Sequence, residues 1–223
     1  METNGFAVVF EDEFILVADK KSGLLVVPTP QQETRTLSSL INDYLKDKRE
    51  QALPCHRLDR DTSGLIIYAK EAEVRRHIMQ QFKEQACRKK YIAVVQGRVV
   101  RSRGVLKGYI RPKGKPAKFA VTKFKVLKRF KKFSIVEVEP KTGRTNQIRI
   151  HLCQLGHCVV GERKYTQAKR WLIRSKRLCL HAYFLQFRHP ISGDTVTLTR
   201  DIPRELKDLL RDLGVEFGLR RWI

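Results

Sequence analysis

The apolar residues follow two different periods along the chain, and each period indicates a different kind of element. Alternating or continuous apolar runs bounded by turn residues indicate strands, whereas apolar residues three or four positions apart indicate helices. Strands are predicted over 6–20 (as a hairpin), 24–27, 65–70, 88–99, 119–127, 133–139 and 177–199 (as a second hairpin). Helices are predicted over 37–44, 71–86, 145–155 and 201–214.

The helix starts have recognisable signals. Thr36 and Thr145 are suited to cap the helices that follow them, and Pro203 is suited to begin the last helix. The predicted strands and helices are intermixed without the regular alternation that builds a parallel sheet. We therefore predict an α+β fold, with a mixed, mostly antiparallel sheet flanked by helices, in a single domain over residues 1–223.

The charge of the chain indicates a polyanionic partner. Lys and Arg number 46 against 23 Asp and Glu, which gives a formal net charge of +23. Each phosphate that such a surface neutralises releases a counterion and favours binding. Acidic membrane is the competing anion, but no stretch approaches the ~20 apolar residues of a membrane span. Nucleic acid is therefore the expected partner, and the amino terminus lacks the pattern of a signal peptide.

Cysteine and histidine spacing argues against a metal site. The five Cys and six His include no C-x-x-C pair and are scattered among apolar segments. We expect no metal, and we expect reduced thiols in a cytoplasmic protein.

The segment from Arg101 to Lys118 is the most basic and turn-rich part of the chain. It could be a linker, but its apolar residues would also allow a projecting hairpin that grips a phosphate backbone. A solvated loop without function is the alternative.

The run CHRLDRDTSGL, from Cys55 to Leu65, places Asp59 between Arg57 and Arg60. Neighbouring guanidinium groups favour the ionised form of a carboxyl group. Such a carboxylate is available as a nucleophile or base, and the alternative is a structural ion pair beside a turn.

A second informative run, PKTGRTNQIRIHLCQLGH, covers residues 140–157. Its predicted helix places Arg149 beside the apolar stripe formed by Ile148, Leu152 and Leu155. Burying an arginine there is costly unless it meets an acid, and Asp59 is one candidate.

These runs resemble the RluA family of pseudouridine synthases. HRLDRDTSGL is similar to the family signature, which reads HRLD, two variable residues and TSGL. Four further segments resemble family segments in the family order: SGLLVVP (22–28), RKKYIAVVQG (88–97), KTGRTNQIRIHLCQLGH (141–157) and LHAYFLQFRHPISG (180–193). Together the matches extend from about Phe6 to Asp194.

The resemblance implies an enzyme that isomerises specific uridines of structured tRNA or rRNA without a metal or organic cofactor. It implies Asp59 as nucleophile, Arg149 as its buried partner, Tyr91 beside the target base, and Arg57 entering the RNA stack that the uridine leaves. The catalytic residues would meet in a central cleft. We further expect RNA to be bound by Arg60, Arg144, Lys113 and Lys115. A monomer is expected, with no membrane partner.

Three features depart from the family pattern. Lys21 replaces a usual proline, Asn146 replaces the histidine of the usual TGRTHQIR, and the small amino-terminal RNA-binding domain of many relatives is not expected here. The first two departures bear on loop geometry and on RNA contacts.

Two other functions compete with this interpretation. The first is an RNA-binding protein that has lost catalysis on the same fold. The second is a metal-dependent nuclease, which needs clustered carboxylates that the sequence does not show.

Overall fold

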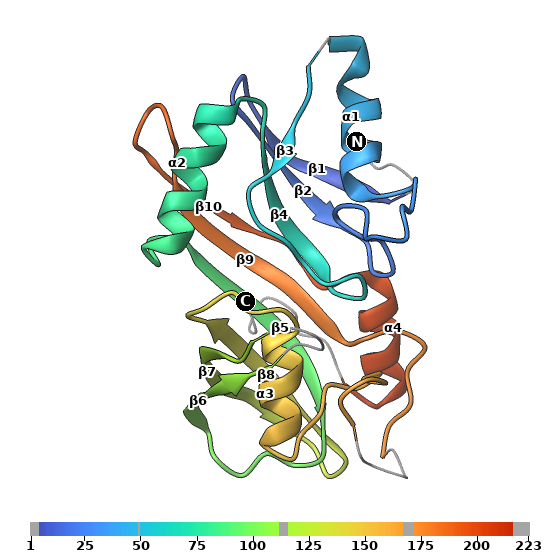
Figure 1. Ribbon diagram of the computed structural model, residues 1–223. Coiled ribbons are helices and arrows are strands. Elements are labelled where there is room, and N and C mark those ends of the chain that lie inside the picture. The colour runs from blue at the N-terminus through green and yellow to red at the C-terminus, as the bar shows by residue number, and fades with distance from the viewer. Residues whose placement is uncertain (1–4, 49, 112–115, 167–171, 216–223) are drawn as a thin grey trace. The chain divides into compact units, whose positions relative to one another are not determined.

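The computed structural model describes residues 5–48, 50–111, 116–166 and 172–215 (Figure 1). Two compact units divide the chain. The first unit comprises Met1–Arg88 and Phe184–Arg200, and the second comprises Lys89–Tyr183 and Asp201–Ile223. The fold is α+β, as the sequence predicted.

The first unit contains a sheet with the strand order β1, β2, β4 and β9, in which β3 also pairs with β4 and β10 with β9. The pairs β1–β2, β2–β4, β3–β4 and β9–β10 are antiparallel. The strands are β1 (Phe6–Glu11), β2 (Ile15–Lys20), β3 (Leu53–Pro54), β4 (Ser63–Ala69), β9 (Leu180–Arg188) and β10 (Thr195–Thr199). Both predicted hairpins are therefore confirmed.

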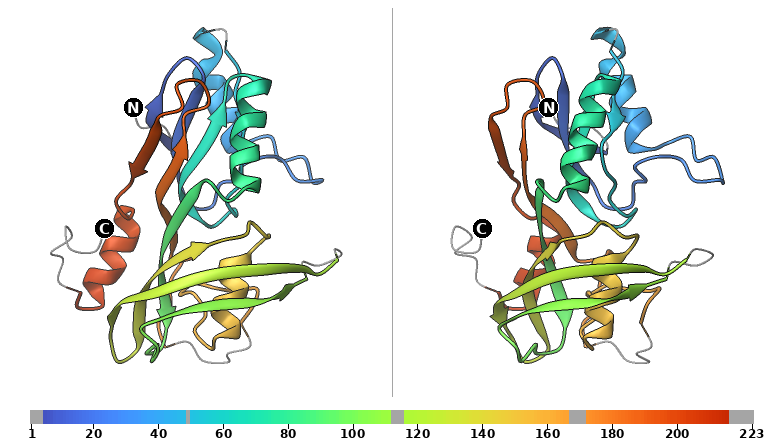
Figure 2. Two further views of the ribbon diagram at one scale, coloured as in Figure 1. Left: turned by 90° about the vertical axis from the view of Figure 1, so that its left-hand side faces the viewer. Right: turned by 60° about the vertical axis from the view of Figure 1, so that its left-hand side comes forward.

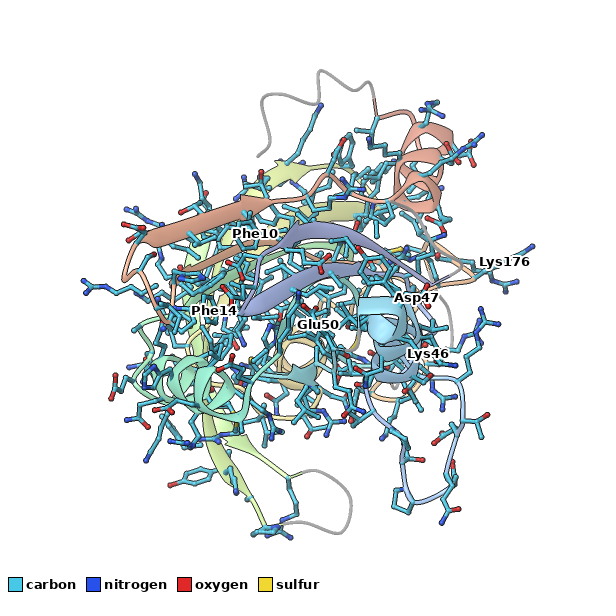
Figure 3. All side chains as sticks on the ribbon, turned by 90° about the horizontal axis from the view of Figure 1, so that it is seen from above. Phe10, Phe14, Lys46, Asp47, Glu50 and Lys176 are labelled. Atoms are coloured by element: carbon cyan, nitrogen blue, oxygen red, sulfur yellow. A yellow bond between two sulfur atoms is a disulfide. The ribbon has the colours of Figure 1, made fainter. Side chains whose placement is uncertain are left out.

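The described residues of this unit form the α-helices α1 (Leu37–Leu45) and α2 (Ala72–Lys83), and a 3-10 helix, η1 (Lys46–Lys48), follows α1. Thr36 caps α1 as predicted, since its side chain accepts the Ser39 N–H and the Ser39 side chain accepts the Thr36 N–H. Val74 and Ile78 of α2 enter a core cluster with β2, β4 and β9. Phe10 and Phe14, which are labelled in Figure 3, pack against this cluster.

The strand predicted over 24–27 does not form. The carbonyls of Leu25 and Val26 instead accept the N–H groups of Leu37 and Ser38, at 2.7 and 3.0 Å. The first N–H groups of a helix have no acceptor within the helix. The carbonyls of this apolar run supply acceptors for α1, and the run therefore does not join a sheet.

The strands of the second unit follow the order β9, β5, β8, β7 and β6. The strand β9 is shared, because residues 180–183 belong to the second unit and residues 184–188 to the first. The pairs β5–β8, β7–β8 and β6–β7 are antiparallel. These strands are β5 (Arg88–Gln96), β6 (Arg103–Ile110), β7 (Lys118–Arg129) and β8 (Phe133–Pro140). The basic segment from Arg101 to Lys118 thus contributes the strand β6, and the partner strand β7 begins only at its last residue, Lys118. The linker alternative is wrong for β6, and the hairpin is formed together with residues that follow the segment.

The helices of the second unit are α3 (Gln147–Gln154) and α4 (Arg204–Asp212). Pro203 precedes α4 as predicted. The predicted cap of α3 was wrong, because Asn146 occupies the N-cap position instead of Thr145. Asn146 adopts φ 55°, a left-handed conformation that asparagine tolerates better than most residues.

The thiols also differ from the prediction at one place. Cys153, in the last turn of α3, forms a disulfide with Cys158, whereas Cys55, Cys87 and Cys179 are not disulfide-bonded. The turn that ends α3 brings the two sulfur atoms of the pair together, and a spacing of five residues does not by itself predict such a turn.

Candidate functional site

Asp59 lies at the start of the tight turn that leads into β4. Its carbonyl oxygen accepts the N–H of Thr62 at 3.1 Å, and Arg60 and Asp61 form the turn between them. All seven residues of β4 are buried, whereas Asp59 is only partly buried. The turn therefore fixes the backbone of Asp59 against a rigid strand.

A buried lysine ties this turn to the neighbouring 21–24 loop. The Nζ of Lys20 donates to two carbonyls of that loop and to the carbonyl of Arg60, at 2.7–2.9 Å. Lys20 is completely buried. The hydroxyl of Ser22 also donates to the carbonyl of Asp61, at 2.6 Å. The loop and the turn thus form one hydrogen-bonded structure.

The two arginines beside Asp59 are both exposed. The Nη2 of Arg60 lies 2.8 Å from Oε1 of Glu33, and half of the Arg60 side chain is accessible to solvent. Solvent screens an exposed pair of this kind and keeps it weak, so a phosphate can compete with Glu33 for Arg60. Arg57 is likewise accessible to a ligand.

The side chains of Cys55 and His56, also in the CHRLD run, have structural roles. Burial raises the pKa of Cys55 to about 12, which keeps its thiol protonated at neutral pH and unsuited to nucleophilic attack. The Nε2 of His56 accepts the N–H of Ile67 at 3.2 Å, and its ring packs 4.7 Å from the ring of Phe82. Asp59 remains the candidate nucleophile of this run.

Tyr91 lies in β5, in the second unit, and is buried opposite Val138 of β8. Beside it, the Nζ of Lys90 lies 3.2 Å from Oε2 of Glu137, and the hydroxyl of Tyr183 donates to the same carboxylate. Burial, reinforced by Glu137, raises the pKa of Tyr183 well above its ordinary value. Tyr91 is therefore held in place by the pairing of β5 with β8 and by burial of its side chain.

Arg149 projects from α3 and forms a two-pronged ion pair with Glu162. Its Nε and Nη2 donate to the two carboxylate oxygens at 2.7 and 2.9 Å. The side chains are 9% and 0% exposed, so this pair is buried. Glu162 also accepts the backbone N–H groups of Lys164 and Tyr165, at 2.7 and 3.2 Å.

The environment of Glu162 keeps it ionised. Burial by itself would raise the pKa of Glu162, but the hydrogen bonds from Arg149 and from the two backbone N–H groups hold that pKa below its ordinary value of 4.5. The acid that a buried Arg149 requires is therefore present within the second unit. Glu162 was not predicted from the sequence, where the one signal is an acid 13 residues after the predicted buried arginine.

Asn146 and Tyr165 complete the surroundings of Arg149. The Oδ1 of Asn146 accepts Nη1 of Arg149 at 2.9 Å, and its Nδ2 donates to the hydroxyl of Tyr165 at 2.7 Å. The guanidinium carbon lies 5.3 Å from the centre of the Tyr165 ring. Asn146, which departs from the family pattern, thus supplies a hydrogen-bond acceptor for Nη1, the third guanidinium nitrogen of Arg149.

Arg144 is exposed and is anchored on β7. Its Nε donates to the carbonyl of Phe119 at 3.2 Å, and its backbone N–H donates to Oε1 of Gln147 at 3.0 Å. Gln147 in turn donates to the carbonyl of Val121 and to the hydroxyl of Thr122, both at 2.9 Å. The TGR loop is therefore attached to the base of the basic hairpin.

The predicted site residues fall in both units. Asp59, Arg57 and Arg60 belong to the first unit, and Tyr91, Arg144 and Arg149 to the second. The central cleft and the contact between Asp59 and Arg149 stay predictions. Lys113 and Lys115 lie outside the described residues.

Among the described residues, no group of three His, Cys, Asp or Glu side chains is arranged to hold a metal ion. The described helices also include none that is long and apolar enough to cross a membrane.

Comparisons with known proteins agree with the resemblance. The sequence model of the family described as RNA pseudouridylate synthase matches residues 14–154. The dual-specificity RNA pseudouridine synthase RluA of Haemophilus influenzae is 37% identical over 205 residues, covering 85% of this chain and 90% of the relative. Ribosomal large subunit pseudouridine synthase D of Neisseria meningitidis is 34% identical, covering 95% of this chain and 62% of the relative.

Solved structures share the fold. Human RNA pseudouridylate synthase domain containing 4 has a TM-score of 0.78 at 24% identity and covers 95% of this chain and 94% of its own. Human RNA pseudouridylate synthase domain containing 1 has a TM-score of 0.74 at 23% identity and covers 97% and 98%. With the family match and the sequence relatives, these observations lead to one conclusion: the chain belongs to the RluA family of RNA pseudouridine synthases, which isomerise uridine in RNA to pseudouridine.

Proposed function

We propose that this enzyme isomerises specific uridines of structured tRNA or rRNA, with Asp59 as its nucleophile. The bond between the ribose and N1 of uracil breaks, the base rotates, and a new bond forms between the ribose and C5. N1 gains a proton and C5 loses one, so the reaction is balanced without an oxidant or a cofactor.

The observation that carries this proposal is the turn that holds Asp59. Lys20 and Ser22 fix its backbone through hydrogen bonds to turn carbonyls, while Asp59 itself is only partly buried. A carboxylate held in this way is preorganised for attack and needs little rearrangement when the substrate arrives.

The remaining roles follow from the surroundings of each side chain. Arg57 is exposed and can stack in the place that an extruded base leaves, offsetting part of the unstacking cost of a few kcal/mol. Tyr91 is buried in a paired strand and is proposed to lie beside the target base. Arg149 is proposed to stabilise the anionic Asp59, and Glu162 and Asn146 fix its orientation.

RNA binding is proposed to use Arg60, Arg144, Lys113 and Lys115. The two arginines are exposed. Arg60 contacts Glu33 and Arg144 contacts the carbonyl of Phe119, and a phosphate can replace either contact. The net charge of +23 supports a polyanionic substrate.

The decisive experiment replaces Asp59 by Asn, which preserves the size of the side chain and removes its nucleophilicity. Pseudouridine formation on total tRNA and rRNA is expected to fall more than about a thousandfold, as for the loss of other enzymatic nucleophiles. RNA affinity is expected to change little, because Arg57 and the other cations remain.

Asp61→Asn provides a matched control, because Asp61 lies in the same turn and has no proposed chemical role. Its activity should stay within a few-fold of wild type. Unchanged activity in Asp59→Asn would refute Asp59 as nucleophile. Wild-type protein that binds RNA but forms no pseudouridine in either RNA class would favour the RNA-binding alternative.

A further inference from the structure

One face of the β6–β7 hairpin carries four exposed cations and two exposed aromatic rings. The two strands pair in antiparallel register, so residues opposite one another share a face. The cross-strand pairs on the outer face are Arg103–Lys125, Val105–Lys123, Lys107–Val121 and Tyr109–Phe119. In both views of Figure 2 the hairpin extends past α3.

The opposite face of β7 is packed. Ala120, Thr122, Phe124 and Val126 are buried, and Thr122 is hydrogen-bonded to Gln147 of α3. Because side chains alternate along a strand, this packing fixes which residues point outward. The outer face is therefore a consequence of the register and cannot turn inward without exposing the core.

The aromatic pair lies toward the end of the hairpin. The Tyr109 and Phe119 rings have centroids 5.5 Å apart in an edge-to-face arrangement. Their residues are 70% and 46% exposed, respectively. Large exposed rings gathered at one place commonly mark a binding site. The carbonyl of Phe119 also accepts a hydrogen bond from Nε of Arg144, so the TGR loop lies beside the aromatic pair.

The cations on this face are available to a ligand. In the part of the chain that the structure describes, Arg103, Lys107, Lys123 and Lys125 are exposed and none of them forms an ion pair with an acid. The adjacent strand β8 does carry acids opposite two of these lysines, Glu139 and Glu137. Those carboxylates are occupied by Lys141 and by Lys90, respectively.

We propose that this outer face binds unpaired nucleotides of the RNA substrate. Bases stack on Tyr109 and Phe119, and phosphates contact the four cations along the strands. This combination of aromatic rings with a basic track is the arrangement by which proteins bind single-stranded nucleic acid. An acidic protein would satisfy the cations but would leave the exposed rings without a role. The inference rests on the proposed function, since it concerns the same substrate.

The test measures binding of a 12-nucleotide oligouridine and of a duplex RNA of equal length by fluorescence anisotropy. The protein is the full chain carrying Asp59→Asn, so that turnover does not alter the probe. Replacing either ring by leucine is expected to weaken oligouridine binding about tenfold, as for the loss of one stacked base. Duplex binding should change much less, because its bases are already stacked.

Matched variants separate stacking from charge and from folding. Phe130 lies in the turn between β7 and β8, at the opposite end of β7 from Phe119. Phe130→Leu should therefore leave the affinity for oligouridine unchanged. Tyr109→Phe keeps a ring and should also bind normally. The double variant Arg103→Gln/Lys125→Gln should lower the slope of log K against log salt by about 1.4, because each lost phosphate contact on a single strand removes about 0.7.

Equal affinity of the leucine variants and the parent protein would overturn the inference, provided that circular dichroism shows the same melting temperature. The Tyr109 and Phe119 rings would then only pack against each other within the hairpin. This result is distinct from failure of the proposed function, which concerns pseudouridine formation by the protein with Asp59 intact. If one of the two leucine variants does not fold, the other leucine variant decides the question.

Discussion

The buried pair of Arg149 and Glu162 offers the sharpest test of how the second unit holds its site. Replacing Glu162 by Ala removes both acceptors of the Arg149 guanidinium and leaves a buried positive charge without its counter-ion. Breaking a buried pair in this way costs about 3–5 kcal/mol. With a urea m-value of about 3 kcal/mol/M, the unfolding midpoint should fall by about 1–1.7 M.

Urea titration followed by circular dichroism measures this change, and Glu205→Ala is the matched control. Glu205 also pairs with an arginine, Arg177, but at 3.8 Å and with 66% of its side chain exposed. Such a surface pair contributes about 0–1 kcal/mol. The two variants therefore compare the same chemical change in buried and exposed surroundings.

The pair also predicts a dependence on pH. The pKa of Glu162 is lowered by folding, so its contribution to stability is present above its ordinary value of 4.5 and is lost as the pH falls below that value. The difference in unfolding free energy between wild type and Glu162→Ala should therefore shrink in acid. A constant difference would contradict the assignment of charge to this carboxyl group.

A double variant separates stability from catalysis. Arg149→Met/Glu162→Leu removes both charges, and most of the lost stability should return because no buried charge is left unpaired. Pseudouridine formation should stay low, since the guanidinium proposed to stabilise Asp59 is absent. A loss below about 1 kcal/mol in Glu162→Ala, or full activity in the double variant, would refute the reasoning.

Two further predictions concern other buried polar groups. Lys20→Met removes the side-chain donor from three carbonyls, of which that of Arg60 still accepts the N–H of Gly23, and should cost about 1–3 kcal/mol in unfolding free energy. It should also lower kcat by loosening the Asp59 turn, whereas the surface variant Lys21→Met should do neither. Burial lowers the pKa of His151 below its ordinary value of 6.5, so the folded state favours the neutral ring. Stability should fall as the pH drops below about 6.5, and His151→Gln should flatten that dependence in urea titrations at pH 7.5 and 5.5; an unchanged slope would contradict this.

Local patterns in the sequence were sufficient for most of the secondary structure. The two hairpins, the capped helix α1 and the strand that carries Tyr91 each depend on residues close together in the chain. The family also followed from sequence, because five motifs occur in order with the acid, tyrosine and arginine in place. Periodicity and residue identity report such features directly.

Tertiary structure decided which distant groups meet. Residues 24–27 are apolar enough for a strand, but their carbonyls are used by the start of α1. Asn146 appears in the sequence as a departure, and only the folded chain shows it bridging Arg149 and Tyr165. The sequence determined that Arg149 lies beside the apolar stripe of its helix. From that position it could be predicted that a buried Arg149 needs an acidic partner. The fold supplied Glu162 within the same unit, because a charge pair depends on distance in space rather than on separation along the chain.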